Sequence, residues 1–325
     1  MISRRSILRA LPVVAGLAIL APRFAISAVS RSLAYAATLQ KLPALSCDCH
    51  VHVFDPDRFP YAESRTYMPD KSPVTVLEQH LKALGLDRVV VVQPSPYGTD
   101  NRCLTDALAR LGTQRARGVA VVEEGIEDTK LAELHAAGIR GVRLNLEVKG
   151  GADLTAVSAN LDSLAERLAP LGWHIQMYAN LETIKALAQT LRKLPVPVVF
   201  DHYGHLDAAK GLHQEGYEEM VSLLREGRIH VKLSALYRVS LQDDYADVEQ
   251  FAKALVAIRP DRLLWGSDFP HTMPPAGTTR SKDKLELFRN EDNGRALNCL
   301  LKWVDDQAVI RQILVDNPAQ LYWKV

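Results

Sequence analysis

The fold begins at Cys47-Asp48-Cys49-His50-Val51-His52-Val53-Phe54-Asp55, a short apolar run that leads into the turn-forming residues Asp55-Pro56-Asp57. Such a run predicts a buried β-strand. Because side chains alternate along a strand, we expect His50 and His52 on one side and Cys47 and Cys49 on the other. Paired imidazoles at the end of a buried strand suit a metal ion or a polarised carbonyl group. The alternative is two core histidines that each make one hydrogen bond.

Predicted strands and helices alternate through the rest of the chain. Further apolar runs predict strands over residues 88–94, 118–122, 139–145, 173–178, 197–201, 229–234 and 262–268. Helices are predicted over residues 73–84, 100–111, 129–137, 154–168, 181–194, 217–226 and 245–258. This alternation predicts a parallel sheet, and the number of units predicts closure into an α/β fold, the (β/α)8 TIM barrel. Residues 285–325 are expected to form two or three C-terminal helices packed outside the barrel.

The composition is that of a soluble globular protein with a large core, since 47% of the 325 residues are hydrophobic and 24% are charged. No linker divides residues 37–325, which are expected to form a single domain. The formal net charge is +1 and no basic patch alternates with aromatic residues, which argues against a nucleic-acid partner. The four cysteines are interpreted as small buried hydrophobic residues, with a disulfide left open: Cys47, Cys49, Cys103 and Cys299.

Residues 1–36 have the features of an export signal. Arg4-Arg5 precedes an uncharged apolar run, and Ala34-Tyr35-Ala36 offers the small residues that a signal peptidase requires, with Ile26-Ser27-Ala28 as a weaker candidate. The segment resembles a twin-arginine (Tat) signal, which implies export by the Tat machinery, cleavage, and a periplasmic protein without a stable membrane anchor. The alternative is a retained signal anchor, but the apolar run is shorter than the ~20 residues that span a bilayer.

Polar residues occupy the carboxyl ends of the predicted strands, where the chemistry of such barrels takes place. They are His50, His52, Gln93, Ser95, Arg143, Asn145, Gln176, Tyr178, Asp201, His202, His205, Lys232, Ser234, Arg238, Asp268 and His271. Any one of them could be a solvated loop residue, and Ser95, Gln176 and Lys232 are individually the least informative. Together they predict one polar site at one end of the barrel.

Three motifs resemble the amidohydrolase superfamily, and more narrowly its amidohydrolase 2 branch. They are Asp48-Cys49-His50-Val51-His52, Phe200-Asp201-His202-Tyr203-Gly204-His205 and Leu264-Trp265-Gly266-Ser267-Asp268-Phe269-Pro270-His271. The resemblance runs from about Leu45 to Tyr322. It implies metal ligands on several strands, but Arg143 and Tyr178 stand where the superfamily has other ligand types. Four candidate ligands for one zinc ion remain, namely His50, His52, His202 and Asp268.

These departures are similar to the subgroup of 2-pyrone-4,6-dicarboxylate lactonases, sulfomuconolactone hydrolases and galactarolactone-type isomerases. That resemblance implies catalysis without a metal or other cofactor. It implies that the lactone carbonyl is bound by His50, His52 and His202. It also implies that Asp268 activates the attacking water.

The same resemblance implies a set of substrate-binding residues. Arg143, Tyr178 and Arg238 match residues that hold the substrate carboxylates, and Ser95 lies in the matching substrate loop. Lys149 and His205 stand where the lactonase has arginines, and both are candidate substrate-binding residues. Guanidinium groups bind carboxylates through two parallel hydrogen bonds, so two arginines on one rim predict an acidic substrate.

The sequence therefore predicts a hydrolase that opens the lactone ring, a carboxylic ester, of a small carboxylate-bearing molecule. A carboxylate beside histidines and water is a plausible general base, and imidazole donors can stabilise the oxyanion that forms. One alternative is a zinc-dependent hydrolase or decarboxylase of the same family. Another is a non-catalytic periplasmic binding protein on the same barrel. The oligomeric state is left open.

Overall fold

A computed structural model describes residues 35–146, 154–274 and 277–324 of the chain, within a unit that runs from Leu33 to Val325. One eight-stranded parallel sheet has the order β1-β3-β4-β5-β6-β7-β8-β9. Its strands are β1 Cys47–Val51, β3 Arg88–Val92, β4 Ala116–Ala120, β5 Ile139–Asn145, β6 His174–Tyr178, β7 Val198–Phe200, β8 Ile229–Ser234 and β9 Leu263–Gly266. Because each strand follows its neighbour in sequence, the predicted TIM barrel is confirmed.

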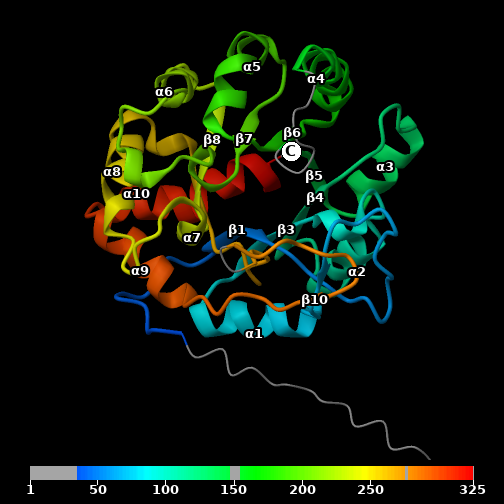
Figure 1. Ribbon diagram of the computed structural model, residues 1–325, viewed down its shortest axis with the longest axis horizontal. Coiled ribbons are helices and arrows are strands. Elements are labelled where there is room, and N and C mark those ends of the chain that lie inside the picture. The colour runs from blue at the N-terminus through cyan, green and yellow to red at the C-terminus, as the bar shows by residue number, and fades with distance from the viewer. Residues whose placement is uncertain (1–34, 147–153, 275–276, 325) are drawn as a thin grey trace, which may run out of the picture. The chain divides into compact units, whose positions relative to one another are not determined.

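Helices surround these strands (Figure 1). They are α1 Val74–Leu84, α2 Arg102–Leu111, α3 Asp128–Ala136, α4 Leu154–Leu168, α5 Leu181–Lys193, α6 Tyr217–Arg225, α7 Leu236–Val239, α8 Glu249–Ile258, α9 Asn293–Trp303 and α10 Gln307–Arg311. Two π-helical segments, Gln312–Asp316 and Ala319–Trp323, complete the predicted helical C-terminus. No helix in these described residues has both the length and the apolar character needed to cross a membrane.

Local sequence explains where several helices begin and end. The N–H groups at the start of α5 find an acceptor in Asn180, whose Oδ1 lies 2.9 Å from the backbone nitrogen of Thr183. Asp292 caps α9 in the same way, 3.0 Å from the backbone nitrogen of Arg295. Gly85 ends α1 in the left-handed conformation, with a φ of 70°, which glycine adopts at little cost. Such signals are short-range, and they can therefore be identified from sequence.

Several predicted boundaries are wrong by two to four residues, and two of them have a clear local cause. The strand predicted over 118–122 is β4, which ends at Ala120, because the side chain of Asn101 binds both the N–H and the carbonyl of Val121. These two backbone groups are therefore bonded outside the sheet. The helix predicted over 245–258 begins as α8 at Glu249, after a 3-10 turn over Ala246–Val248.

A β-bulge in β1 changes which way its side chains point. Asp48 pairs with Val89 but Val51 with Val91, so β1 carries one residue more than β3 over this interval. Cys47 and Cys49 pack with Val90 and Val92 of β3, Val119 and Leu264 in a small interior cluster closed by Tyr322. The prediction that the cysteines face away from the histidines is therefore wrong, because the extra residue breaks simple alternation and turns His50 inward above them. Cys47, Cys49 and Cys103 are buried as predicted, whereas Cys299 is half-buried.

The barrel closes where β9 approaches β1. The backbone N–H of Asp268 donates to the carbonyl of His50 at 2.9 Å, and that of His52 donates to the carbonyl of Phe269 at 2.8 Å. Gly266 permits this approach, because a Cβ at that position would lie only 2.7 Å from the Cβ of His50. Closure therefore depends on a glycine and places Asp268 beside His50 of β1 and His52, which directly follows the strand.

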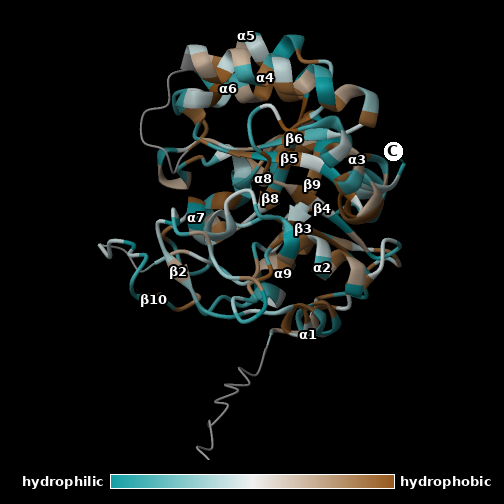
Figure 2. Cartoon of the chain, turned by 90° about the vertical axis from the view of Figure 1, so that its right-hand side faces the viewer, coloured by the Kyte–Doolittle hydropathy of each residue, from teal (hydrophilic) through white to brown (hydrophobic). Residues whose placement is uncertain are grey.

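A small parallel ribbon lies away from the main sheet, on the side of the molecule opposite the C-terminus (Figure 2). It pairs β10 Leu285–Glu286 with β2 Met68–Pro69 and so joins the loop after β9 to the loop after β1. Both loops leave the carboxyl ends of barrel strands. The ribbon therefore belongs to the end of the barrel at which the active site is expected.

The N-terminal end of the described chain is attached to the barrel by Tyr35. Its hydroxyl accepts from Asn293 Nδ2 at 3.0 Å and lies 2.9 Å from His80 Nδ1. His80 Nε2 in turn lies 3.1 Å from the carboxylate of Asp48 in β1. Of the predicted export signal over residues 1–36, residues 1–34 lie outside the described residues, and the structure describes only Tyr35 and Ala36.

Candidate active site

Asp268 follows β9 and is held by two donors on one of its carboxylate oxygens. The hydroxyl of Tyr237 lies 2.6 Å from Oδ2, and Nε of Arg238 lies 2.7 Å from the same atom. Both donors come from the one-turn helix α7, which follows β8. Among the described residues, Oδ1 is buried without a hydrogen-bond partner. The carboxylate thus presents one oxygen to the interior of the site.

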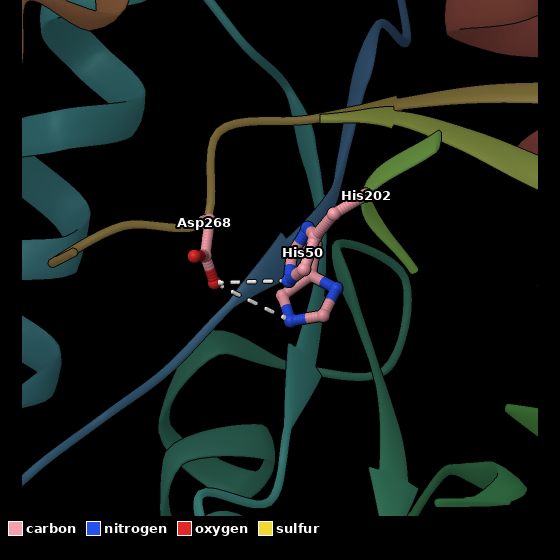
Figure 3. A group of neighbouring side chains, drawn as sticks. All are labelled: His50, His202 and Asp268. Carbon is pink, nitrogen blue, oxygen red and sulfur yellow. Dashed lines mark ion pairs between the residues drawn. The ribbon is translucent and has the colours of Figure 1, made fainter. Parts of the chain in front are cut away.

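Three imidazoles face this oxygen (Figure 3 draws His50, His202 and Asp268). The Nε2 atoms of His50, His52 and His202 lie 3.5, 3.4 and 3.8 Å from Asp268 Oδ1. His50 and His52 come from the end of β1, and His202 from the turn that follows β7. The predicted catalytic residues are therefore brought together around a single point.

Each ring is oriented by a contact to its other nitrogen. His52 Nδ1 lies 2.8 Å from the carbonyl of Val92, which can only accept, so Nδ1 carries a hydrogen. His202 Nδ1 lies 2.8 Å from the hydroxyl of Ser234. Val92 ends β3 and Ser234 ends β8, so each contact comes from the strand next to the one that carries the histidine. Such contacts fix the orientation of the imidazole ring.

His50 rests on a buried group formed by Lys232, Gln176 and Asp201. The ammonium nitrogen of Lys232 lies 2.6 Å from Gln176 Oε1, 3.2 Å from His50 Nδ1 and 3.4 Å from Asp201 Oδ1. An ammonium group has three donors and no acceptor, and three acceptors surround it here. On this basis we assign the Nδ1 lone pair of His50 to the Lys232 ammonium, and the ring hydrogen to Nε2, facing the site. Asp201 Oδ1 also lies 3.1 Å from Nδ1, as an ion-pair partner of the ring.

The charges of this group follow from burial and proximity. Burial alone would raise the pKa of Asp268, but Arg238 and His202 outweigh it and hold that pKa well below its usual range. Burial, only partly offset by Asp201, lowers the pKa of His50 to about 4. Burial, partly offset by Asp268, lowers the pKa of His202 well below its usual value. Near neutral pH the site therefore combines the carboxylate of Asp268 with neutral imidazoles at His50 and His202.

The backbone around the site adopts the left-handed conformation at several residues other than glycine. The φ angles are 64° at Asp268, 48° at His202, 55° at His205 and 52° at Ala235. Such conformations cost of order 1–3 kcal/mol each and persist where the surrounding structure imposes them. These residues lie in the turns after β7, β8 and β9. The same turns direct the side chains of Asp268 and His202 into one cleft.

The cleft above Asp268 has a volume of about 150 Å³. Its walls are formed by His52, Tyr67, Pro94, Ser95, Arg143, Asn145, Tyr178, His202, Arg238, Asp268, Thr272 and Arg280. Three arginines against one carboxylate make it a site for a small anion. A larger hollow of about 490 Å³ lies outside the barrel along α2 and α3, but it contains none of the predicted site residues. We therefore place the active site in the smaller cleft.

The predicted substrate-binding residues are placed differently from one another. Arg143, Tyr178, Arg238 and Ser95 line the cleft. His205 is outside the set of cleft-lining described residues, and it contacts the site through Tyr178, whose hydroxyl lies 2.8 Å from His205 Nε2. Lys149 falls in residues 147–153, outside the described residues. Arg238 contacts Asp268 as well as the cleft, a role that the sequence alone did not indicate.

Several residues of the site were not predicted. Tyr237 could not be anticipated because the turn that brings it to Asp268 depends on the left-handed Ala235. Asp201, Gln176 and Lys232 were recognised as strand-end residues without a role. Alternation along β8 could have suggested that Lys232 shares the side of Ser234. Arg280 lies in a loop without periodic pattern, and no sequence signal identified it.

The donor atoms match zinc in spacing but not in hydrogen bonding. Ligands 2.0–2.1 Å from a tetrahedral zinc ion lie about 3.4 Å apart, close to the separations measured from Asp268 Oδ1. His52 also has the Nδ1 contact to a carbonyl that metal-binding histidines commonly make. His50 does not fit, because the hydrogen on its Nε2 blocks the lone pair that a metal needs. The site therefore fits zinc only in part.

Residues 47–323 match the sequence profile of a family described as amidohydrolase. The chain belongs to this amidohydrolase family. This amidohydrolase is 37% identical over 297 residues to a 2-pyrone-4,6-dicarboxylate hydrolase of Comamonas testosteroni, covering 87% of this chain and 92% of that one. It is 32% identical over 288 residues to a 4-sulfomuconolactone hydrolase of Hydrogenophaga intermedia, covering 87% and 90%. A crystal structure from Pseudomonas putida, described as a 2-pyrone-4,6-dicarboxylic acid hydrolase, superposes with a TM-score of 0.73 at 33% identity, covering 86% and 98%. The family and subgroup indicated by the three motifs are confirmed.

Proposed function

We propose that this protein hydrolyses the lactone ring of a small, carboxylate-bearing molecule. The observation that carries the proposal is the convergence of three imidazole Nε2 atoms on the unbonded Oδ1 of Asp268, inside a cleft lined by arginines. The names of the relatives support the same chemistry, since two of them are hydrolases of carboxylated or sulfonated lactones. The cleft volume of about 150 Å³ suits a single substituted ring.

Asp268 is the base of the proposed reaction. A water molecule on Oδ1 gives its proton to the carboxylate as its oxygen attacks the lactone carbonyl carbon. The carbonyl oxygen becomes an oxyanion, which the Nε2 hydrogen of His50 stabilises. The ring C–O bond then breaks, and the proton on Asp268 passes to the departing oxygen. The product is an open chain with one new carboxylate, and one proton is released to solution.

The arginines are proposed to bind the carboxylates of the substrate. Arg143 and Arg238 flank the cleft from β5 and α7. A substrate carboxylate that recruits Arg238 would weaken its pairing with Asp268, and the pKa of Asp268 would then rise. A stronger base would therefore appear only when substrate is bound. Tyr178, fixed by His205, completes this wall of the cleft.

We propose that catalysis needs no metal. The support is the hydrogen bond from Lys232 to His50 Nδ1, which makes Nε2 a donor toward the carbonyl instead of a ligand. The positive charges of Arg238 and Lys232 also disfavour a divalent cation nearby. The second candidate is a zinc-dependent hydrolase, which the spacing of His50, His202 and Asp268 favours, since their ligand atoms lie within 4.8 Å of one another. Zinc, if bound there, would supply a Lewis acid for the carbonyl.

Elemental analysis of purified protein, combined with activity after exhaustive chelation, decides between these candidates. We expect substoichiometric zinc and unchanged turnover after chelation. Stoichiometric zinc whose removal abolishes activity, and whose return restores it, would overturn the metal-free proposal and assign His50, His52, His202 and Asp268 as ligands.

The lactonase function itself is tested with a panel of carboxylated lactones, followed by proton release. Wild-type protein should open at least one of them. Asp268→Asn should lower kcat by about 10²–10⁴ while substrate affinity stays within about tenfold, because the amide keeps the shape but cannot accept the proton. If no lactone is opened but one binds, a non-catalytic binding protein is the better description.

We also propose that the protein is exported to the periplasm by the Tat machinery, on the basis of Arg4-Arg5 and the apolar run that follows. Changing both arginines to lysine should retain the protein inside the cell. Normal recovery of that variant from the periplasm would contradict Tat export. A variant with Arg9→Lys, outside the arginine pair, is the matched control.

A further inference from the structure

A third arginine faces the substrate cleft. Arg280 comes from the loop after β9, whereas Arg143 and Arg238 come from β5 and α7. The other two arginines are engaged at the base of the site, since Arg238 binds Asp268 and Arg143 Nε lies 3.7 Å from Asp201. Arg280 is paired with Glu286 instead. It is therefore the arginine whose charge is least committed to the catalytic carboxylates.

Arg280 is held rigidly. Its guanidinium carbon lies 3.8 Å from the centroid of the Tyr67 ring, and its NH2 group lies 2.9 Å from Glu286 Oε1. Stacking on an aromatic face and an ion pair together restrict a side chain that would otherwise sample many rotamers. Tyr67 is 4% exposed and the side chain of Arg280 is 28% exposed, which places the guanidinium at the mouth of the cleft.

The β2–β10 ribbon supports this arrangement from behind. Glu286 pairs across the ribbon with Pro69, and Pro69 lies two residues after Tyr67 in the chain. Backbone pairing in the ribbon therefore fixes Glu286, the ion-pair partner of Arg280, close to Tyr67, on whose ring Arg280 stacks. The ribbon therefore holds the guanidinium in place before a ligand binds. This reduces the conformational entropy that the side chain loses on binding.

We propose that Arg280 binds a second anionic group of the substrate, a carboxylate or a sulfonate, at the mouth of the cleft. The inference rests on the proposed lactonase function and adds to it a specificity-determining residue from the loop after β9. One group would lie near Arg143 and Arg238 beside the reacting carbonyl, and the other near Arg280. A guanidinium offers a planar fork of donors that matches either anion.

The test compares lactones that differ by one anionic group. The probes are 2-pyrone-4,6-dicarboxylate and the two pyrones that keep only one of its carboxylates, with 4-sulfomuconolactone as the sulfonate arm. We expect Arg280→Gln to raise KM for the dianionic lactones by about 10–100-fold, with kcat changed much less, since one charge-assisted contact is lost. The preference for two anionic groups over one should fall by the same factor.

Lys284→Gln is the matched control, because Lys284 is exposed in the same loop and its change removes the same charge. It should leave the preference for dianionic lactones unaltered. Arg280→Lys keeps the charge without the fork and should give an intermediate loss, which also serves if Arg280→Gln folds poorly. An unchanged preference in a folded Arg280→Gln protein overturns the proposal.

Failure of the lactonase function would be distinguishable from failure of this inference. If the wild-type protein opens no lactone, the dicarboxylate can still be titrated by calorimetry. Weaker binding to Arg280→Gln than to Lys284→Gln would then support the anion site while the lactonase function is withdrawn. Equal binding by both variants would reject the Arg280 site on its own.

Discussion

Arg238 Nε donates to Oδ2 of Asp268 at 2.7 Å, the same carboxylate oxygen that accepts from the Tyr237 hydroxyl at 2.6 Å. The pairing leaves Oδ1 free toward the three imidazoles. It also couples two functions, because the arginine that is proposed to bind substrate sets the basicity of the proposed base. A change at Arg238 should therefore be detectable in the chemistry of Asp268 as well as in substrate affinity.

Arg238→Gln should move the acid limb of the pH dependence of kcat/KM to higher pH. The sign follows because the positive charge of Arg238 lowers the pKa of Asp268, and its removal lets that pKa rise. At neutral pH, kcat/KM should fall by about 10–100-fold through loss of a carboxylate contact. The measurement is a pH profile of kcat/KM, with Lys284→Gln as the control. An acid limb at the wild-type position would show that Arg238 does not govern Asp268.

Lys232→Met should convert His50 from a donor into a potential metal ligand. Without the ammonium, Nδ1 of His50 can donate to Asp201 Oδ1, 3.1 Å away, and Nε2 becomes a bare lone pair. We expect kcat to fall by about 10²–10³, as for loss of one oxyanion donor, and the affinity for zinc to increase. Zinc affinity is measured by calorimetry, and the ring tautomer by nitrogen NMR of the histidines.

The control for this change is Lys210→Met, since Lys210 is a surface lysine whose side chain is 68% exposed. That variant should match the wild type in activity and in zinc affinity. A folded Lys232→Met protein with wild-type zinc affinity and an unaltered His50 tautomer would refute the assignment of Lys232 as the residue that orients His50.

Gly266→Ala should damage both stability and activity. A Cβ there would meet the Cβ of His50 at 2.7 Å and its backbone nitrogen at 2.9 Å, so β9 must separate from β1. We expect the free energy of unfolding to fall by about 1–3 kcal/mol, as for other overpacked core positions, and kcat to fall with it. Gly141→Ala is the comparison, because its Cβ would meet the ring of His174 at 2.4 Å instead. That variant should lose stability while the remaining folded protein keeps its kcat.

Stability should fall steeply when the pH drops below about 6.5. Burial lowers the pKa of His174, His230 and His271 to about 3 each, whereas their unfolded values lie near 6.5. The unfolded chain therefore binds protons first, and the stabilisation present above pH 6.5 is lost progressively down to about pH 3. Each of these histidines should contribute about 1.4 kcal/mol per pH unit over this interval. Urea denaturation between pH 5 and pH 8 measures the slope, and a flat profile would contradict neutral burial.

The barrel could be predicted from sequence because its signals are local. Runs such as Val89–Val92 and the cap at Asn180 depend only on neighbours in the chain. The identities of the site residues could also be predicted, since parallel strands bring their carboxyl ends to one place. What could not be predicted was the bulge in β1, which moves the cysteines to the interior, because register depends on the partner strand.

The contacts within the site were equally inaccessible from sequence. The roles of Tyr237, Lys232 and Arg280 depend on distances across separate strands and loops, as in the 3.2 Å contact from Lys232 to His50. The pattern and spacing of a sequence predict which face of a strand a residue occupies. They do not predict which imidazole nitrogen of His50 the side chain of Lys232 contacts. That difference matters here, because the choice of ring nitrogen separates an imidazole donor from a zinc ligand.

The bonding of Tyr35 has a consequence for maturation of the chain. Its hydroxyl lies in a relay that runs from Asp48 through His80 and Asn293 to His271, beside Asp268. A signal peptidase that cut after Ala36 would remove this tyrosine, whereas a cut after Ala28 would retain it. We infer that the second position yields the intact barrel, so under the proposed export the intact mass of the mature protein should correspond to a first residue at Val29. The two cleavage positions are eight residues apart, and only the earlier one keeps the contacts of Tyr35 with His80 and Asn293.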